Sequence, residues 1–278
     1  MSNTALITGA SSGLGREFAR YHASKGGDVI STARRESALQ ELKAELEEEH
    51  GVRAHVIALD LAAEGGAQRL YDEVSALGVR VQILINNAGL GGQGVHVERD
   101  LEAEQFMIAL NVDALVTLTH LFANDMVTQG GGKILNVGST AGMMPGPNQA
   151  VYFATKAFVN SFSQAVDQEL RGKGVTSTLL APGYVETEFA EVADLEGSKM
   201  VKAGGADAAQ VARHGYDAMM RGELFTINDW KLSFLLNWVT PFVPRRWLLK
   251  AVGESQAARL MSKAEQTKRS LLEQGRRL

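Results

Sequence analysis

Short apolar runs alternate with longer helical patterns along the first two thirds of the chain. The run Thr4–Thr8 precedes a helical pattern over Leu14–Lys25, and the run Asp28–Ala33 precedes one over Ser37–Glu49. The runs are rich in Val, Ile and Leu and lack polar alternation, which is typical of strands that are buried on both faces. Such alternation predicts a parallel, doubly wound α/β sheet, a Rossmann-like fold.

The alternation continues to residue 181. Further strands are expected over Ala54–Leu59, Val81–Asn86, Lys133–Gly138 and Thr176–Ala181, and helices over Ala67–Leu77, Glu98–Thr128 and Ala150–Arg171. An irregular stretch, Tyr184–Gly205, then leads to a helix over Asp207–Met220 and a last strand over Leu224–Ile227. No linker, repeat or low-complexity tract interrupts the chain, so residues 1–278 are expected to form one domain. Residues 223–278 are interpreted as a helical C-terminal extension of that domain.

Composition excludes several classes of function. The net charge of -4 gives no basic excess to follow a nucleic-acid backbone, so nucleic-acid binding is disfavoured. The chain has no cysteine, which rules out disulfides and thiolate metal sites, and the six histidines show no metal-ligand spacing. No signal peptide fits before the first strand, and no apolar run is long enough to predict a membrane span. The expected location is the cytoplasm.

A glycine-rich turn joins the first strand to the first helix. It reads Thr8-Gly9-Ala10-Ser11-Ser12-Gly13-Leu14-Gly15. Glycines allow the backbone to turn sharply and to approach a ligand closely, and the N-terminus of the helix offers free N–H groups to a pyrophosphate. Because this turn stands at the start of a strand–helix–strand pattern, it predicts a dinucleotide site.

Tyr152 and Lys156 stand four residues apart on a predicted helix, and Ser139 lies 13 residues before Tyr152. Residues at positions i and i+4 share one helix face, so the phenol and the ammonium can reach one small volume. A nearby ammonium favours the phenolate and is expected to lower the pKa of Tyr152. A tyrosine tuned in this way can exchange a proton with an alcohol or carbonyl oxygen.

The motifs together resemble the short-chain dehydrogenase/reductase family. The glycines follow the Gly-x-x-x-Gly-x-Gly spacing of that family, and Asn86-Asn87-Ala88-Gly89 ends the fourth strand. Asn111, Ser139 and the Tyr152/Lys156 pair follow in order, and Pro182-Gly183 and Thr187 come after the sixth strand. The resemblance covers about residues 4 to 190.

The resemblance implies a role for each matching residue. Tyr152 is expected to act as the general acid in reduction and the base in oxidation, Ser139 to hold the substrate oxygen, and Lys156 to bind the nicotinamide ribose. Asn111 is expected to position a water in a proton relay through Lys156, with a helix kink as the alternative role. Asp60 is expected to contact the adenine, with capping as its alternative. The remaining cofactor contacts are expected from Gly9, Ser11, Ser12, Gly13, Leu14, Gly15, Leu61, Asn87, Ala88, Gly89, Pro182, Gly183, Val185 and Thr187.

The end of the second strand bears on the choice of dinucleotide. An acidic residue there would hydrogen-bond the ribose 2′-hydroxyl and repel a 2′-phosphate, but Ala33 occupies the position and Arg34 follows. A guanidinium can bind a phosphate bidentately and stack on adenine. The sequence therefore favours NADP(H), with Arg34 as the main contact and Arg35 and Ser12 as helpers. The alternative is that both arginines begin a solvated helix.

The substrate pocket is expected to be mainly apolar. Its candidate residues are Met143, Met144, Pro145, Phe153, Tyr184, Phe189 and Val192, beside Ser139 and Tyr152. An apolar carbonyl or alcohol is therefore expected as substrate: a ketone, an aldehyde, or a steroid-like or fatty-acyl group. Aromatic and apolar residues near the C-terminus leave four roles open: a lid, a subunit contact, a membrane-surface anchor, or packing on the core. They are Trp230, Phe234, Leu235, Trp238, Phe242, Val243 and Trp247.

Two further expectations concern assembly and activity. The resemblance implies a homodimer or homotetramer built through the fourth and fifth large helices, here Glu98–Thr128 and Ala150–Arg171. Ser255–Leu278 carries more Lys and Arg than acidic residues, and a solvated helix is the favoured interpretation. The competing hypotheses for the whole chain are an NADPH-binding regulator without turnover and a lipid enzyme that works at a membrane surface.

Overall fold

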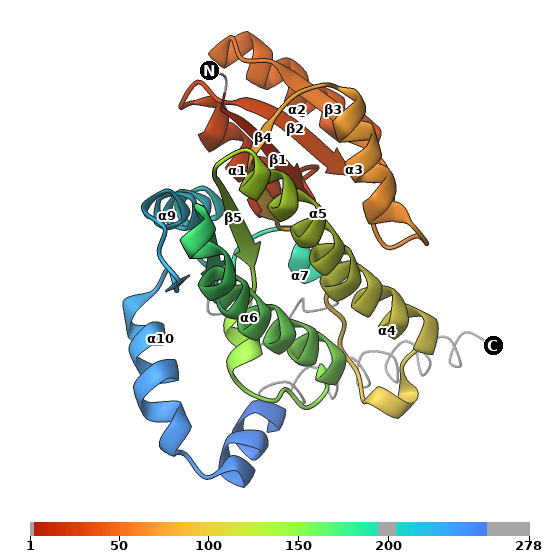
Figure 1. The fold of residues 1–278 in the computed structure, drawn as a ribbon. Helices are drawn as coiled ribbons and strands as arrows, with labels where there is room; N and C mark the ends of the chain where they lie inside the picture. The colour runs from red at the N-terminus through yellow and green to blue at the C-terminus, as the bar shows by residue number, and fades with distance from the viewer. Residues whose placement is uncertain (1–2, 194–203, 255–278) are drawn as a thin grey trace, which may run out of the picture.

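The computed structural model describes residues 3–193 and 204–254 of the chain. Its centre is a seven-stranded parallel sheet with the strand order β3-β2-β1-β4-β5-β6-β7 (Figure 1). The strands are β1 (Thr4–Thr8), β2 (Asp28–Ala33), β3 (Ala54–Ala58), β4 (Val81–Asn86), β5 (Gly132–Val137), β6 (Val175–Leu180) and β7 (Phe225–Thr226). The predicted doubly wound α/β fold is confirmed. The order of the strands reverses between β1 and β4, where folds of this type bind ligands at the carboxyl ends of the strands.

Helices cover both faces of the sheet. One layer contains α1 (Gly13–Ala23), α2 (Glu36–His50) and α9 (Ala208–Arg221), and the other α3 (Gly66–Ala76), α5 (Ala114–Thr128) and α6 (Ala150–Leu170). Within β1, Ala5 and Ile7 pack into the first layer and Leu6 into the second, and all three are fully buried. Because both faces of the strands are buried, continuous apolar runs mark them in the sequence.

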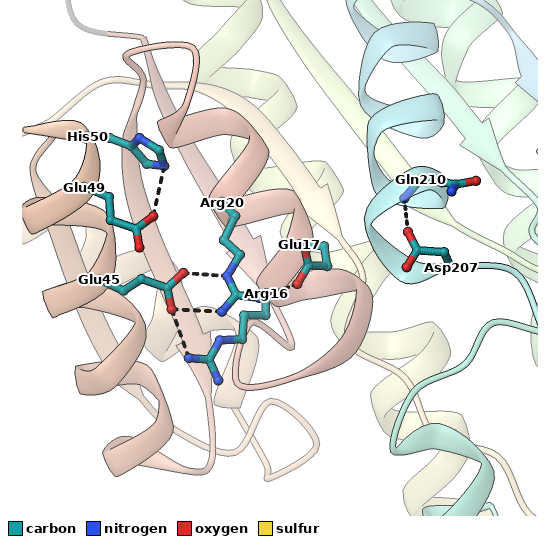
Figure 2. Close-up of polar contacts among 8 residues, drawn as sticks. All are labelled: Arg16, Glu17, Arg20, Glu45, Glu49, His50, Asp207 and Gln210. Carbon is teal, nitrogen blue, oxygen red and sulfur yellow. Dashed lines mark hydrogen bonds and ion pairs between the residues drawn. The ribbon is translucent and has the colours of Figure 1, made fainter.

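Polar contacts join the helices of the first layer. Arg20 of α1 makes a bidentate contact with Glu45 of α2, at 2.5 and 2.9 Å, and Arg16 reaches the same carboxylate (Figure 2). The Arg20 guanidinium lowers the pKa of the Glu45 carboxyl by hydrogen bonding, so the pair stays charged near neutral pH. A second contact in the same view is the N-cap of α9, where the Asp207 side chain accepts a hydrogen bond from the Gln210 backbone. The first contact fixes α1, whose N-terminus follows the glycine turn.

The long helix predicted over Glu98–Thr128 is not uniform. A 3₁₀ turn (His96–Glu98) precedes α4 (Leu101–Ile108), a π-helical turn over Ala109–Asp113 and then α5. By length and hydropathy alone, Leu101–Thr128 could cross a membrane. In the structure it packs on the sheet, and Leu118, Phe122 and Met126 are almost fully buried. This burial is typical of the core helix of a globular protein.

After β7 the chain forms an arm at the outer edge of the molecule, beyond α6 (Figure 1). We define the C-terminal arm as residues 229–254. It contains α10 (Trp230–Phe234), a π-helical turn (Leu235–Val239), a 3₁₀ turn (Thr240–Phe242) and a helix over residues 245–254. The charged segment Ser255–Leu278 lies outside the described residues. Of the irregular stretch Tyr184–Gly205, the described part contains the short helix α7 (Phe189–Val192).

Candidate active site

A cavity of about 760 Å³ lies at the carboxyl ends of the strands, a volume within the usual range of small-molecule sites. It brings together predicted residues that are far apart in the sequence: Gly9, Ser11, Ser12, Gly13, Leu14, Arg34, Arg35, Asp60, Leu61, Asn87, Ala88, Gly89, Ser139, Met144, Tyr152, Phe153, Lys156, Pro182, Gly183, Tyr184, Val185, Thr187 and Phe189. Gly15, Asn111, Met143 and Pro145 do not line it. In the described part of the chain, no group of three or more acidic, His or Cys side chains could hold a metal ion.

The glycine turn forms one end of the cavity. Gly9 and Gly13 have positive φ angles of 68° and 52°, which L side chains rarely adopt. Gly15 lies behind the turn, where an added Cβ would stand 2.3 Å from the Gly9 carbonyl oxygen. Gly15 therefore allows α1 to pack closely against the turn and does not contact the cavity itself. The Thr8 hydroxyl accepts hydrogen bonds from the Asn87 and Ala88 N–H groups, which ties β1 to β4.

Ser139 is held in place by Asn160, a residue whose role was not predicted. Asn160 Nδ2 donates to the Ser139 carbonyl at 3.0 Å, and Asn160 Oδ1 accepts from the Ser139 N–H at 3.4 Å. An added Cβ on Gly138 would meet Asn160 Oδ1 at 2.1 Å, so the glycine makes room for this clamp. Tyr152, Lys156 and Asn160 follow at i, i+4 and i+8 on α6, and this spacing was the available signal.

Tyr152 extends into the cavity beside aromatic rings. Its ring centroid lies 6.1 Å from that of Phe153 and 5.6 Å from that of Phe189. Loss of solvation raises the pKa of Tyr152 to about 12, and a hydrogen bond with Ser139 lowers it in part. The expectation of a lowered pKa for this tyrosine is therefore wrong for the protein alone.

Lys156 accounts for part of the difference, because its ammonium is hydrogen-bonded to a backbone carbonyl and does not contribute to the shift of the Tyr152 pKa. Lys156 Nζ donates to the Val137 carbonyl at 2.8 Å, and only 6% of the residue is exposed. Burial lowers the pKa of Lys156 to about 8. The i, i+4 spacing thus places both residues at one cavity, as predicted, without making the lysine charge the main influence on the tyrosine.

Asn111 lies in the π-helical turn between α4 and α5 and is buried. Its side chain donates to the Leu90 carbonyl and the Thr155 hydroxyl and accepts from the Leu90 N–H, at 2.8 to 3.0 Å. A Cβ added to Gly89 would lie 3.3 Å from Asn111 Oδ1 and 3.5 Å from Lys156 Nζ, so both side chains approach one point behind the cavity wall. The helix irregularity considered as an alternative role is present, and π-turns of this kind are frequent at functional sites.

The two arginines after β2 line the cavity in different settings. The Arg34 guanidinium lies 5.8 Å from the Phe106 ring centroid. Arg35 donates to Ser11 Oγ and to the Glu188 carboxylate, the latter at 2.8 Å. Arg35 thereby lowers the pKa of Glu188, which the sequence analysis did not single out. Asp60 lies where both of its considered roles are open to it. It lines the cavity, where an adenine contact was expected, and its side chain caps the chain after β3 by accepting a hydrogen bond from the Ala62 N–H at 2.9 Å.

The other end of the cavity is apolar. It is lined by four residues of the C-terminal arm, none of which was predicted: Leu232, Leu236, Ala251 and Val252. Met143 lies beneath this wall and packs with Leu232 and Leu236. The aromatic residues of the arm face outward, and Trp230, Trp238 and Trp247 are 74%, 68% and 72% exposed. For these three tryptophans, the prediction that they pack on the core is therefore wrong.

Comparison with known proteins agrees with these features. The family model for short chain dehydrogenase matches residues 3–196. Sulfoacetaldehyde reductase 2 of Chromohalobacter salexigens is 41% identical over 214 residues, which cover 76% of this chain and 81% of that protein.

Two solved structures share the fold. A short-chain dehydrogenase from Sphingobium yanoikuyae in complex with NADPH is 30% identical with a TM-score of 0.78, over 86% of this chain and 92% of that one. The bulky-bulky ketone specific alcohol dehydrogenase of Comamonas testosteroni is 27% identical with a TM-score of 0.73, over 98% and 94%. With its glycine turn, its Ser139, Tyr152 and Lys156 at one cavity and this family match, the chain belongs to the short-chain dehydrogenase/reductase family of NAD(P)-dependent oxidoreductases that act on CH–OH groups.

Proposed function

We propose that the protein is an NADP(H)-dependent oxidoreductase that interconverts an apolar secondary alcohol and ketone, or an apolar primary alcohol and aldehyde. One observation carries the proposal: Ser139, Tyr152 and Lys156 line the same cavity as the glycine turn and the two arginines. Proton-handling groups and a dinucleotide cradle are thus parts of one site, with an apolar compartment beside them. An NADPH-binding regulator would not need the first of these three features.

The residues of this site fit a dinucleotide. Gly9 and Gly13 hold positive φ angles that bring the backbone close to the cavity, and the N-terminus of α1 begins at the same turn. A pyrophosphate is stabilised by such a helix end. Gly9, Ser11, Ser12, Gly13 and Leu14 would hold the phosphates. Asp60, Leu61, Asn87, Ala88 and Gly89 would line the adenosine half, and Pro182, Gly183, Val185 and Thr187 the nicotinamide half.

The choice of NADP(H) depends on charge at the end of β2. Ala33 stands where a carboxylate would repel a 2′-phosphate, and Arg34 and Arg35 line the cavity beside it. Arg35 and Ser11 are within hydrogen-bonding distance of each other, so a phosphate near Ser11 could be bound by both. The similarity to a structure in complex with NADPH supports the same choice.

In the proposed mechanism, the bound nicotinamide supplies or accepts the hydride, and the protein orients the substrate and manages the proton. Tyr152 gives its proton to the carbonyl oxygen during reduction, while Ser139, fixed by Asn160, holds that oxygen. Lys156 would hold the nicotinamide ribose. Asn111 would position a water that relays protons through Lys156. A pKa raised to about 12 keeps the Tyr152 phenol protonated near neutral pH, so it has a proton to donate to the carbonyl oxygen.

The proposed substrate is apolar because of the cavity wall. Met144, Phe153, Tyr184 and Phe189 line it together with the four apolar residues of the arm. The cations that line the described cavity are Arg34, Arg35 and Lys156, all assigned to the cofactor, so no cation remains for an anionic substrate. This disfavours sulfoacetaldehyde, the substrate named for the Chromohalobacter relative, and favours a larger ketone.

The test is oxidation of NADPH over a panel of carbonyl compounds: bulky ketones, 3-ketoacyl esters, steroids, aldehydes and sulfoacetaldehyde. We expect turnover with at least one bulky apolar carbonyl, and a kcat/KM for NADPH above that for NADH. Turnover with sulfoacetaldehyde alone would contradict the substrate class. Tight NADPH binding without oxidation by any compound in the panel would instead support the regulator hypothesis.

We also propose that the protein is a homo-oligomer that uses α4, α5 and α6. Leu101, Ile108 and Phe158 on these helices are 62%, 40% and 42% exposed, and burial of these apolar side chains against a second copy would stabilise the assembly. Sedimentation velocity should show a dimer or tetramer, and substitution of Phe158 by Ser should shift it toward smaller species. A monomer at all concentrations would contradict this proposal.

A further inference from the structure

The C-terminal arm has two faces of different character. Leu232 and Leu236, one turn apart, point inward, and they pack against Met143 and Met144. The same two leucines line the cavity that contains Tyr152. The inner face of the arm is therefore a wall of the candidate active site.

The outer face carries large aromatic side chains that are exposed in the described part of the chain. Trp230, Phe234 and Trp238 follow at i, i+4 and i+8 and are 74%, 59% and 68% exposed. Further along the arm, Phe242 and Trp247 are 84% and 72% exposed. All three tryptophans of the chain lie in the arm, and all three are exposed. A contiguous set of exposed aromatic residues marks an interaction surface, since single exposed apolar residues are ordinary and clusters are not.

Basic side chains accompany the aromatic ones. Lys231, Arg245, Arg246 and Lys250 are exposed, against two acids in the arm, so the arm has a formal charge of 4 − 2 = +2 in a chain of net charge -4. Both acids have local partners: the Asp229 carboxylate caps α10 by accepting from the Lys231 and Leu232 N–H groups, and Glu254 lies 3.8 Å from Lys250. The charge available to a partner is therefore positive.

Two kinds of occupant would cover the aromatic side chains, and charge decides between them. A second copy of the chain, related by a twofold axis, would place the same patch against itself and bring Arg245 and Arg246 near their equivalents. Like charges on facing surfaces oppose such a contact. An anionic lipid surface attracts the basic residues, and tryptophan is enriched at the depth of the lipid headgroups. Aromatic and basic residues also occur together on helical segments that lie in the plane of a membrane surface, and in the arm they are on consecutive segments.

We propose that the outer face of the C-terminal arm binds the surface of an anionic lipid bilayer. Trp230, Phe234, Trp238 and Phe242 enter the headgroup region, and the basic residues contact lipid phosphates. The inner face of the arm then separates the lipid from the cavity by the thickness of a single helical segment. An apolar carbonyl compound dissolved in the bilayer would reach Leu232 and Leu236 by a short path, a consequence that rests on the proposed function.

The test is co-sedimentation of the full chain with lipid vesicles, which requires no turnover. One vesicle is phosphatidylcholine alone, and the other contains phosphatidylglycerol as well. We expect binding to the anionic vesicles to exceed binding to the neutral ones by about tenfold or more, and to weaken as salt is added. Replacement of Arg245 and Arg246 by Gln should lower the anionic partition by about thirtyfold, because two charges at about 1 kcal/mol of attraction each are lost.

The decisive variant removes aromatic side chains from the outer face: Trp230→Ser, Trp238→Ser and Phe242→Ser together. Its matched control removes exposed apolar side chains elsewhere, Val97→Ser and Leu224→Ser, which are 87% and 43% exposed in the parent chain. The triple variant should lose about tenfold or more of its vesicle partition. It should keep NADPH affinity and thermal stability, and the control should behave as the parent chain in every assay.

Three outcomes would overturn the proposal. The full chain could fail to bind anionic vesicles. The triple variant could bind as well as the control. The triple variant could also change the sedimentation coefficient while leaving the vesicle partition unchanged, which would assign the aromatic surface to a second copy. Failure of the proposed enzymatic function would show instead as absence of NADPH oxidation with vesicle binding intact.

Discussion

The carboxyl edge of the sheet and the C-terminal arm are built in contrasting ways. At the edge, side chains such as Asn111 and Asn160 are buried and make several hydrogen bonds to fixed backbone groups. In the arm, the aromatic side chains are exposed, and its inner face contacts the rest of the described chain through apolar packing. Both regions line one cavity.

This difference separates two tasks. Hydrogen-bonded, buried groups hold reacting atoms in a defined geometry, which proton transfer requires. Apolar contacts without directional bonds accept ligands of varied shape, which suits substrate selection. Substitutions at the edge should therefore change rate or cofactor affinity, and substitutions on the inner face of the arm should change substrate preference.

The largest expected effect is at Tyr152. Replacement by Phe removes the acidic proton and preserves the ring that packs with Phe153 and Phe189. We expect kcat for reduction to fall by about 10²- to 10⁴-fold with NADPH affinity almost unchanged. Steady-state kinetics and fluorescence titration of NADPH measure the two quantities. A variant that loses NADPH affinity in parallel would assign Tyr152 to binding rather than to proton transfer.

The next effect concerns the dinucleotide. Replacement of both Arg34 and Arg35 by Gln should weaken NADPH binding by about tenfold to a hundredfold, because charge-assisted hydrogen bonds to the 2′-phosphate are lost. NADH binding should change by less than about threefold. Glu188→Gln is the matched control, since it removes the partner of Arg35 and leaves both guanidinium groups. Equal losses for NADPH and NADH would contradict the assignment.

A variant of Asn160 tests whether the carboxyl edge of the sheet contributes to the rate by positioning Ser139. Replacement by Ala removes both bonds to the Ser139 backbone, and we expect kcat to fall by about tenfold while the KM for NADPH is retained. Its pH profile should keep the shape of the parent profile, because Asn160 does not titrate. A fall in thermal stability with kcat unchanged would make its role structural only.

Lys156 predicts a pH dependence of cofactor affinity. Its pKa is lowered to about 8, so the ammonium is present below that pH and is lost above it. Affinity for NADPH should be highest below about pH 8 and should fall by about tenfold or less as pH rises through that value, since one charge-assisted hydrogen bond weakens. In Lys156→Arg the charge persists and this step should vanish. A midpoint near the ordinary lysine pKa would contradict the burial argument.

The smallest effect is expected in the arm. Leu236→Ala enlarges the apolar end of the cavity and should raise KM for a bulky ketone by about threefold to tenfold without changing NADPH affinity. Leu235→Ala is the matched control, because the neighbouring Leu235 is 48% exposed and does not line the cavity. A change of NADPH affinity in Leu236→Ala would contradict the assignment of substrate selection to the arm and of cofactor binding to the sheet edge.

The contrast between the sheet edge and the arm also explains which features could be predicted from the sequence. β1, β2 and β4 have the bounds expected from their apolar runs, because burial on both faces leaves a continuous pattern. A helix kink at Asn111 was considered only as an alternative, and its π-helical form was not predicted, since a change of backbone hydrogen-bond register leaves no mark in hydrophobic periodicity. The pKa of Tyr152 was predicted in the wrong direction because spacing places Lys156 nearby without showing that its ammonium binds the Val137 carbonyl.

The arm shows a different limit. Its aromatic residues were conspicuous in the sequence, yet the residues that line the cavity are the aliphatic Leu232, Leu236, Ala251 and Val252 between and after them. The helical turns decide which residues face inward, and the π-helical turn over Leu235–Val239 shifts that pattern locally. Residue type alone therefore identified the arm as a distinctive segment, but it did not identify the residues that line the cavity.

In the proposed reaction, hydride from NADPH and a proton from Tyr152 are both transferred to a carbonyl group in this cavity. The most direct measurement uses NADPH that carries deuterium at the transferable C4 position, with each ketone of the panel and mass spectrometry of the product. We predict an alcohol labelled at the carbinol carbon with the parent chain and almost none with Tyr152→Phe. Product without the label, or equal labelled product from both proteins, would contradict the account.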